Sequence, residues 1–99
     1  MLGFTAVCIA GPSMEPALRS GDWWIVRTFG PIRPGAIVLL RHPRRPDLLV
    51  VKRATREEPG GWWVEGDNAA SSDDSRSFGA VRRDLIIGAL VVRYRRGPT

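Results

Sequence analysis

Short apolar runs separated by glycine and proline are the feature that most constrains the fold of this 99-residue chain. Eleven Gly and eight Pro divide the sequence into pieces that are too short for long helices. The apolar pieces are rich in β-branched and aromatic residues, which favour strands. Strands are therefore expected at residues 1–10, 23–26, 36–40, 48–51 and 62–65, with one or two closing strands at 85–92. The pattern predicts an all-β domain.

The size and composition of the chain fit one globular domain with a modest core. Hydrophobic residues make up 43% and charged residues 25%, as is usual for soluble proteins. We expect the domain to span residues 1–92, with 93–99 as a basic C-terminal tail. Cys8 is the only cysteine, so no intrachain disulfide can form, and we interpret it as a small core residue. A single cysteine is compatible with the cytoplasm.

One serine follows the first expected strand directly and lies in a stiff turn. Pro12 and Pro16 fix the backbone on either side of Ser13, while Gly11 permits close approach of another chain. A serine held in this way can present its hydroxyl to a substrate. The alternative is an ordinary Pro/Gly turn with a solvated serine.

The sole lysine of the chain ends another apolar strand. The fifteen Lys and Arg residues include a single lysine, Lys52, which follows the run Leu48-Leu49-Val50-Val51. A desolvated lysine can lose its proton, whereas an arginine in a protein does not. Lys52 is therefore the one basic side chain that could take a proton from Ser13. The alternative is an exposed lysine at the end of a strand.

Four motifs occur in an order that resembles the serine-lysine peptidases of the signal peptidase I class. They are Gly11-x-Ser13-Met14-x-Pro16, then Gly21-Asp22, then Val51-Lys52-Arg53, and last Gly66-Asp67-Asn68 with Ser72-x-Asp74-Ser75-Arg76. Residues 40–43, 47–53 and 60–64 look like a narrower branch, the small nickel-type superoxide dismutase maturation proteases. The resemblance implies a compact, β-barrel-like catalytic core, because the short segment between Lys52 and Gly66 has no room for the large second subdomain.

The resemblance also implies a role for each matching residue. Ser13 would be the nucleophile, its backbone N–H would hold the oxyanion, and Lys52 would be the general base. Burial beside Met14, Val50 and Val51 would lower the pKa of the Lys52 amine. Many relatives carry a hydroxyl donor at the position of Gly11, and this chain lacks it.

Three further residues would support the base. By resemblance, Ser72 would orient the Lys52 amine, and Asp74 would pair with Arg76 beneath the site. The alternative is a solvated turn of mixed charge, in which the neighbouring Asp73 could replace Asp74 in the pairing. Functional sites need such fixed supporting groups.

The substrate of such a peptidase would bind as an extended strand, pairing main chain to main chain. The segments beside the nucleophile and the base would line its cleft, namely Ile9, Ala10, Gly11, Pro12, Leu49, Val50 and Val51. The narrower resemblance implies cytoplasmic removal of the N-terminal propeptide of a nickel superoxide dismutase, without a stable membrane anchor. The alternative is signal peptidase-like processing of exported proteins.

Other functions fit the residues less well. A net charge of +5 and four Trp would suit a β-barrel that binds nucleic acid, but the Trp residues come in strand pairs rather than along a basic face. A self-cleaving repressor domain would need a longer segment before Ser13. His42, the only histidine, lies in an Arg-rich, Pro-flanked segment that is expected to be a mobile loop, which disfavours a serine-histidine pair. No metal-ligand spacing occurs, so we expect no metal or other cofactor.

Overall fold

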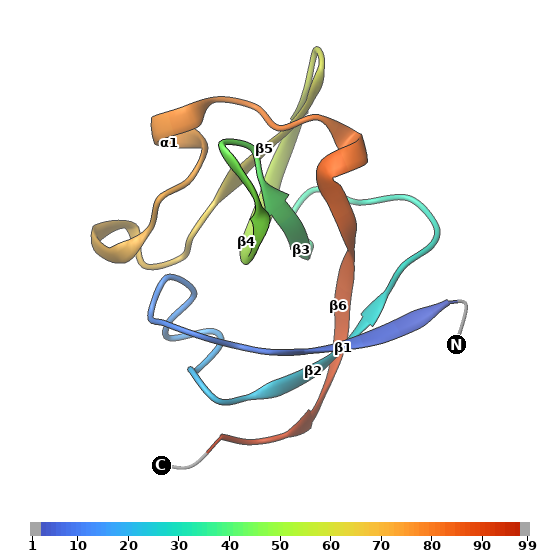
Figure 1. The fold of residues 1–99 in the computed structure, drawn as a ribbon, viewed down its shortest axis with the longest axis vertical. Helices are drawn as coiled ribbons and strands as arrows, with labels where there is room; N and C mark the ends of the chain where they lie inside the picture. The colour runs from blue at the N-terminus through green and yellow to red at the C-terminus, as the bar shows by residue number, and fades with distance from the viewer. Residues whose placement is uncertain (1–2, 98–99) are drawn as a thin grey trace.

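The computed structural model describes residues 3–97 as one six-stranded antiparallel sheet (Figure 1). Its strands pair in the order β1-β2-β6-β3-β4-β5. They are β1 (Phe4–Cys8), β2 (Trp23–Arg27), β3 (Ile37–His42), β4 (Arg45–Glu58), β5 (Gly61–Glu65) and β6 (Ile86–Arg95). Three short helical turns lie between β5 and β6, namely η1 (Ala69–Ser71), α1 (Ser75–Phe78) and η2 (Arg83–Leu85). The all-β class predicted from the sequence is confirmed.

Two long strands change partners along their length and so bend the sheet. The first part of β4 pairs with β3, and its last part, from Arg53 onward, pairs with β5. Strand β6 pairs with β3 near its start and with β2 farther along. In Figure 1, β6 consequently runs between a lower layer of β1 and β2 and an upper layer of β3, β4 and β5.

The hydrophobic core has two parts that correspond to these layers. The larger cluster fills the upper layer, with Val38 and Leu40 of β3 and Val64 of β5 almost fully buried. The smaller cluster comprises Ile9, Met14 and Leu18. Partly buried side chains of β1, β2, β3, β4 and β6 pack against this smaller cluster. The turn that follows β1 is therefore fixed to the rest of the sheet by apolar contacts.

The structure differs from the sequence-based expectations at three boundaries. His42 is not in a mobile loop, because it ends β3 and only two residues separate it from β4. β6 continues to Arg95, so the expected tail boundary at Val92 falls inside a strand that pairs with β2. The expected first strand begins at Phe4 and ends at Cys8, and the expectation that Cys8 is a core residue is wrong, because this residue is exposed. Met1 and Leu2 lie outside the described residues, as do residues 98 and 99.

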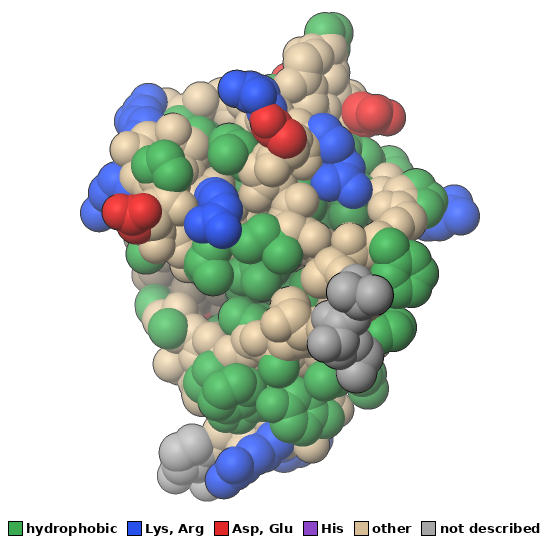
Figure 2. Space-filling model, turned by 45° about the vertical axis from the view of Figure 1, so that its right-hand side comes forward, with side chains coloured by type: hydrophobic (Ala, Val, Ile, Leu, Met, Phe, Trp, Pro, Cys, Tyr) green, Lys and Arg blue, Asp and Glu red, His purple; other side chains and the backbone are tan. Residues whose placement is uncertain are grey.

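The exposed hydrophobic side chains and the character of the helices both bear on function. Several large hydrophobic side chains are exposed, and Figure 2 shows hydrophobic side chains gathered across the middle and lower part of one face. Within residues 3–97, none of the helices has the length and apolar character needed to cross a membrane.

Candidate active site

The turn that carries Ser13 is held at its base and at its centre. Ile9 N–H donates to the Asp22 carbonyl across 2.8 Å, which closes the base of the loop between β1 and β2. Leu18 N–H donates to the Met14 carbonyl, also within the turn. Met14 and Leu18 are each only 1% exposed, so the turn is rooted in the core. Ser13 itself is partly exposed and faces a cavity.

The Lys52 side chain comes from β4 and is buried. Its Cα lies opposite Val38 of β3, and the residue is 4% exposed. The Nζ atom donates a hydrogen bond to Ser72 Oγ across 3.2 Å. The contact between Lys52 and Ser72 is therefore the one that the sequence led us to expect, whereas their catalytic roles stay a prediction.

Ser13 and Lys52 line the same cavity of about 210 Å3. The walls are mainly apolar and come from the end of β1 and from β4. Five of the expected substrate-binding residues line it, namely Ile9, Ala10, Leu49, Val50 and Val51. Gly11 and Pro12 do not; their backbone groups bond within the protein, to Ser20 Oγ and to the Asn68 side chain.

The cleft has unpaired strand edges on both sides. Residues 49–52 of β4 pair with β3 on one edge, and β5 does not begin to pair until Arg53. Among the described residues, β1 pairs only with β2. Each side of the cleft thus offers free backbone groups, which an extended peptide could complete as an added strand.

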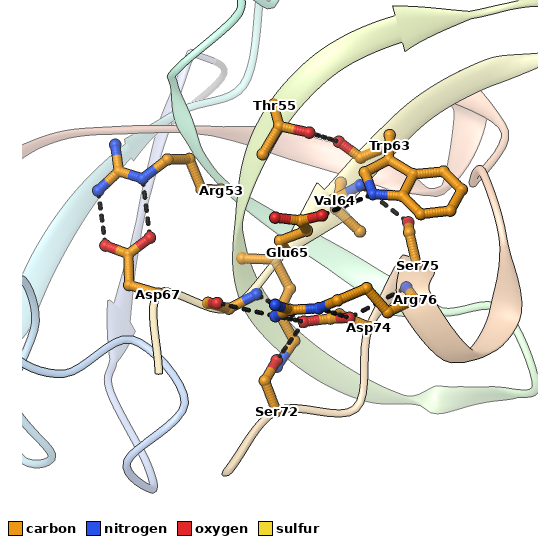
Figure 3. A network of polar contacts seen from close by, with 12 residues as sticks. Arg53, Thr55, Trp63, Val64, Glu65, Asp67, Ser72, Asp74, Ser75 and Arg76 are labelled. Carbon is orange, nitrogen blue, oxygen red and sulfur yellow. Dashed lines mark hydrogen bonds and ion pairs between the residues drawn. The ribbon is translucent and has the colours of Figure 1, made fainter. Parts of the chain in front are cut away.

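The Ser72 hydroxyl, which accepts the Lys52 hydrogen bond, belongs to a charged network with Asp74 and Arg76 (Figure 3). Ser72 Oγ donates to Asp74 Oδ2 across 2.7 Å, and the Gly66 N–H donates to the same oxygen. The Arg76 guanidinium donates to both carboxylate oxygens and also to the Gly66 carbonyl. Although burial opposes ionisation, these hydrogen bonds hold the pKa of Asp74 well below its usual range. The predicted Asp74–Arg76 pair is therefore present, and Asp73 does not replace Asp74 in it.

The environment of Lys52 favours its neutral form. Burial lowers the pKa of its amine, while the negative charges of Asp74 and Asp73 oppose the shift and Arg76 adds to it. The net direction is downward from the ordinary value of 10.5. Because Asp74 is already neutralised by Arg76, the amine lies beside a compensated carboxylate rather than a free one.

The segment Gly66-Asp67-Asn68 contacts the serine turn, strand β4 and the Ser72 segment. The motif order alone assigned it no such role. Asn68 N–H donates to the Ser13 carbonyl across 2.8 Å, while Asp67 forms a paired contact with the Arg53 guanidinium (Figure 3). A Cβ at Gly66 would lie 2.2 Å from Ser72 Oγ and 2.7 Å from the Ser13 carbonyl oxygen. Only glycine lets the serine turn and the Ser72 segment approach this closely.

The residues that would serve the alternative functions, namely a serine-histidine pair, a metal site and a nucleic-acid surface, are arranged differently. His42 is buried, and its ring bonds to Asp73 and to the Arg44 N–H, away from the residues that line the cavity. Within residues 3–97, no group of three His, Cys, Asp or Glu side chains is placed to hold a metal ion. Trp62 is 4% exposed, and Trp63 lies under the Arg56 guanidinium rather than on an open basic face.

Comparisons with known proteins indicate the family of the chain. A family model described as "Peptidase S24-like" matches residues 3–91. Mitochondrial inner membrane protease subunit 1 of Xenopus tropicalis is 32% identical over 116 residues, covering 93% of this chain and 69% of that protein. The mitochondrial ATP-independent inner membrane protease subunit 1a of Arabidopsis thaliana is 34% identical, covering 86% and 67%. Subunit 2 of the mouse protease is 32% identical, covering 80% and 62%.

The fold and these similarities define a peptidase domain. The chain belongs to the peptidase S24-like family, and its similarity to inner membrane protease subunits extends over most of its length.

Proposed function

We propose that the chain is an endopeptidase that uses Ser13 as nucleophile and Lys52 as general base. One observation carries the proposal: the only lysine of the chain is buried in the wall of the cavity that Ser13 lines, with its amine held by Ser72. A buried amine with a lowered pKa is the state that a general base needs near neutral pH.

The reaction follows from these groups. The neutral Lys52 amine takes the Ser13 proton as Ser13 Oγ attacks the scissile carbonyl, and the resulting ammonium returns that proton to the leaving amine. Within the described residues, the Ser13 N–H has no hydrogen-bond acceptor, so it is available to the oxyanion. Water then attacks the acyl-serine with Lys52 again as base, which releases the new carboxylate and restores Ser13.

The substrate would be an extended segment of a protein precursor. Its backbone would pair with the free edges of β1 and β4, and an apolar side chain would enter the cavity between them. The apolar residues Leu48 and Leu49 are 40% and 47% exposed beside this cavity, which suits a hydrophobic peptide.

The family relatives favour signal peptidase-like processing of precursors. The similar proteins are subunits of mitochondrial inner membrane proteases, so removal of an N-terminal segment is the reaction that the comparisons support best. The motifs at residues 40–43, 47–53 and 60–64 support a narrower candidate, namely cytoplasmic maturation of a nickel superoxide dismutase precursor. The chemistry is consistent, since cleavage would free the α-amine that serves as a nickel ligand in those dismutases.

One assay tests the proposal and distinguishes the two substrates. The purified chain is mixed with the dismutase precursor in buffer, and in parallel with a signal-peptide precursor presented in lipid vesicles. A single cut that Ser13→Ala abolishes would support the dyad, and the substrate that is cut would assign the branch. Cleavage by Ser13→Ala at the wild-type rate would refute the mechanism. Detecting the chain in membrane fractions rather than in the cytoplasm of its source cells would count against the narrower candidate.

A further inference from the structure

The only histidine lies outside the proposed dyad but has an unusually complete set of contacts. His42 is 2% exposed at the end of β3. Its Nε2 atom lies 2.9 Å from Asp73 Oδ2, and its Nδ1 atom accepts the Arg44 N–H across 3.1 Å. Both ring nitrogens are therefore satisfied inside the protein.

These partners define which nitrogen carries the proton. Because the Arg44 backbone donates to Nδ1, that nitrogen presents its lone pair, and Nε2 must carry the hydrogen. The Nε2–H then donates to the Asp73 carboxylate. This placement of the hydrogen fits the site, since a hydrogen on Nδ1 would face another donor. The charged groups at the contact between the His42 ring and Asp73 are Asp73 itself, Arg44 and Arg45.

His42 contacts both ends of the segment that supports the base. Asp73 lies next to Ser72, which receives the Lys52 hydrogen bond. At the other end, Phe78 packs edge-on against the His42 ring, with 5.1 Å between the ring centroids. Between these ends, Ser75 Oγ accepts the Val64 N–H, and the Ser77 carbonyl accepts a hydrogen bond from the Arg44 side chain.

His42 and Lys52 also emerge from neighbouring strands toward the same segment. Val38, Leu40 and His42 occupy alternate positions of β3 and are buried, as is Leu39, and Val38 lies opposite Lys52 of β4. Residues that lie directly opposite in an antiparallel pair point to the same face. The contacts that hold the segment 72–78 thus include the Lys52 amine at Ser72 and the His42 ring at Asp73 and Phe78. The Gly66 N–H at Asp74 and the Val64 N–H at Ser75 hold its middle.

We propose that His42 is a positioning residue: by holding Asp73 and Phe78, it fixes the segment 72–78 so that Ser72 stays on the Lys52 amine and water stays away from it. The inference rests on the proposed function of Ser13 and Lys52. His42 itself transfers no proton in the reaction. Its role requires the Nε2–H donor toward Asp73, not a charge.

The role makes a specific prediction for the Lys52 amine, which is faced by Asp73, Asp74 and Arg76. Burial is the main cause of its lowered pKa. His42→Leu keeps apolar bulk but removes the donor, so the segment should loosen and admit water, and the pKa of Lys52 should rise toward its ordinary value. Asp73→Asn should act in the opposite direction, because it retains an acceptor for His42 but removes a negative charge near the amine.

The amine can be observed directly because the chain contains one lysine. Protein labelled with 13C at lysine Cε gives a single side-chain resonance, and its shift against pH reports the pKa of Lys52 without any substrate. His42→Gln is the conservative variant, since its amide N–H can replace Nε2–H toward Asp73. Leu40→Ala is the matched control, because it removes packing from the same face of β3 without touching Asp73.

We expect the pKa of Lys52 to rise in His42→Leu and to fall in Asp73→Asn. It should keep its wild-type value in His42→Gln and Leu40→Ala. In peptide cleavage, His42→Leu should lower kcat about 10- to 100-fold with little change in KM, as a small displacement of a catalytic group does. Unchanged titration and kcat in His42→Leu would overturn the proposal. So would an equal shift in Leu40→Ala, which would show general loosening, or a failure of His42→Gln to restore the wild-type values.

The two proposals can fail separately. If Lys52→Met cleaves as well as the wild type, the proposed function is wrong whatever His42 does. If cleavage depends on Ser13 and Lys52 but His42→Leu behaves like the wild type, only the positioning role is wrong.

Discussion

Lys52 Nζ and Ser72 Oγ lie 3.2 Å apart, and the Ser72 hydroxyl hydrogen is directed away from the amine toward Asp74. Ser72 therefore accepts a hydrogen from Lys52 and cannot compete for its lone pair. In the neutral amine, one N–H is held by Ser72, and the lone pair is left to point elsewhere in the cavity. This arrangement suits a base that must receive a proton from Ser13.

Ser72→Ala should lower kcat about 10- to 100-fold with little change in KM, because the amine loses the acceptor that orients it. Steady-state kinetics with a precursor-derived peptide would measure both constants. Ser71→Ala is the matched control, since Ser71 is an exposed hydroxyl one residue away. Equal activity in the two variants would show that Ser72 does not orient the base.

The rate of cleavage should rise with pH. Only the neutral amine can accept the Ser13 proton, and its fraction grows as pH passes the pKa of Lys52. Because burial lowers that pKa below 10.5, the rising limb of kcat/KM should lie below that value. A pH series of kcat/KM would locate the limb. Lys52→Arg should be inactive at every pH tested, as its guanidinium keeps its proton.

The sequence was informative about the fold because its signals are local. Trp23-Trp24-Ile25-Val26 and Trp62-Trp63-Val64-Glu65 are strands in the structure, as their composition and flanking turns indicated. His42 and Arg93 were misjudged, because an Arg-rich sequence resembles a loop or a tail when strand pairing is invisible. Arg93 pairs with Trp24 of β2, a contact between residues far apart in the chain.

The candidate site residues could be predicted only where a local sequence signal or a known motif marks them. Ser13 and Lys52 were found from a stiff turn and a sole lysine, and Ser72, Asp74 and Arg76 from the order of motifs. The joining role of Asn68 and the contacts of His42 depend on how distant segments meet. Neither residue carries a local pattern that reveals its partner.

Asp74→Asn should destabilise the fold by about 1–3 kcal/mol near neutral pH, since it removes the acceptor of several charge-assisted hydrogen bonds. The sign of the pH dependence follows from the lowered pKa. A depressed carboxyl pKa contributes stability above its ordinary value of 3.8, and that stability is lost as pH falls below it. Urea unfolding against pH should show this loss in the wild type and less of it in Asp74→Asn. Asp84→Asn, in an exposed pair with Arg82, is the control and should change little.

Gly66→Ala should lower the rate of cleavage even in protein that remains folded. The added Cβ would collide with Ser72 Oγ and with the Ser13 carbonyl, so the serine turn and the supporting segment must move apart. Gly60→Ala is a suitable comparison, because a Cβ there meets no atom within 4 Å and only backbone strain at φ +89° is introduced. It should cost about 1 kcal/mol of stability and leave cleavage intact. If the two variants lose activity equally, close approach at Gly66 is not needed.

Val51→Phe should block the cleft while sparing the dyad. Val51 lines the cavity of about 210 Å3 beside Lys52, and its side chain also packs against the small core cluster of Ile9, Met14 and Leu18. A ring at this position would occupy the space that we assign to an apolar side chain of the substrate. Cleavage of a peptide with a large apolar residue at the cut should be lost, while one with glycine there should be cut with a higher KM but a similar kcat. Stability measured by thermal unfolding would detect overpacking of the cluster, which typically costs about 1–3 kcal/mol. Unchanged cleavage of both peptides by a folded Val51→Phe protein would mean that the substrate side chain binds elsewhere.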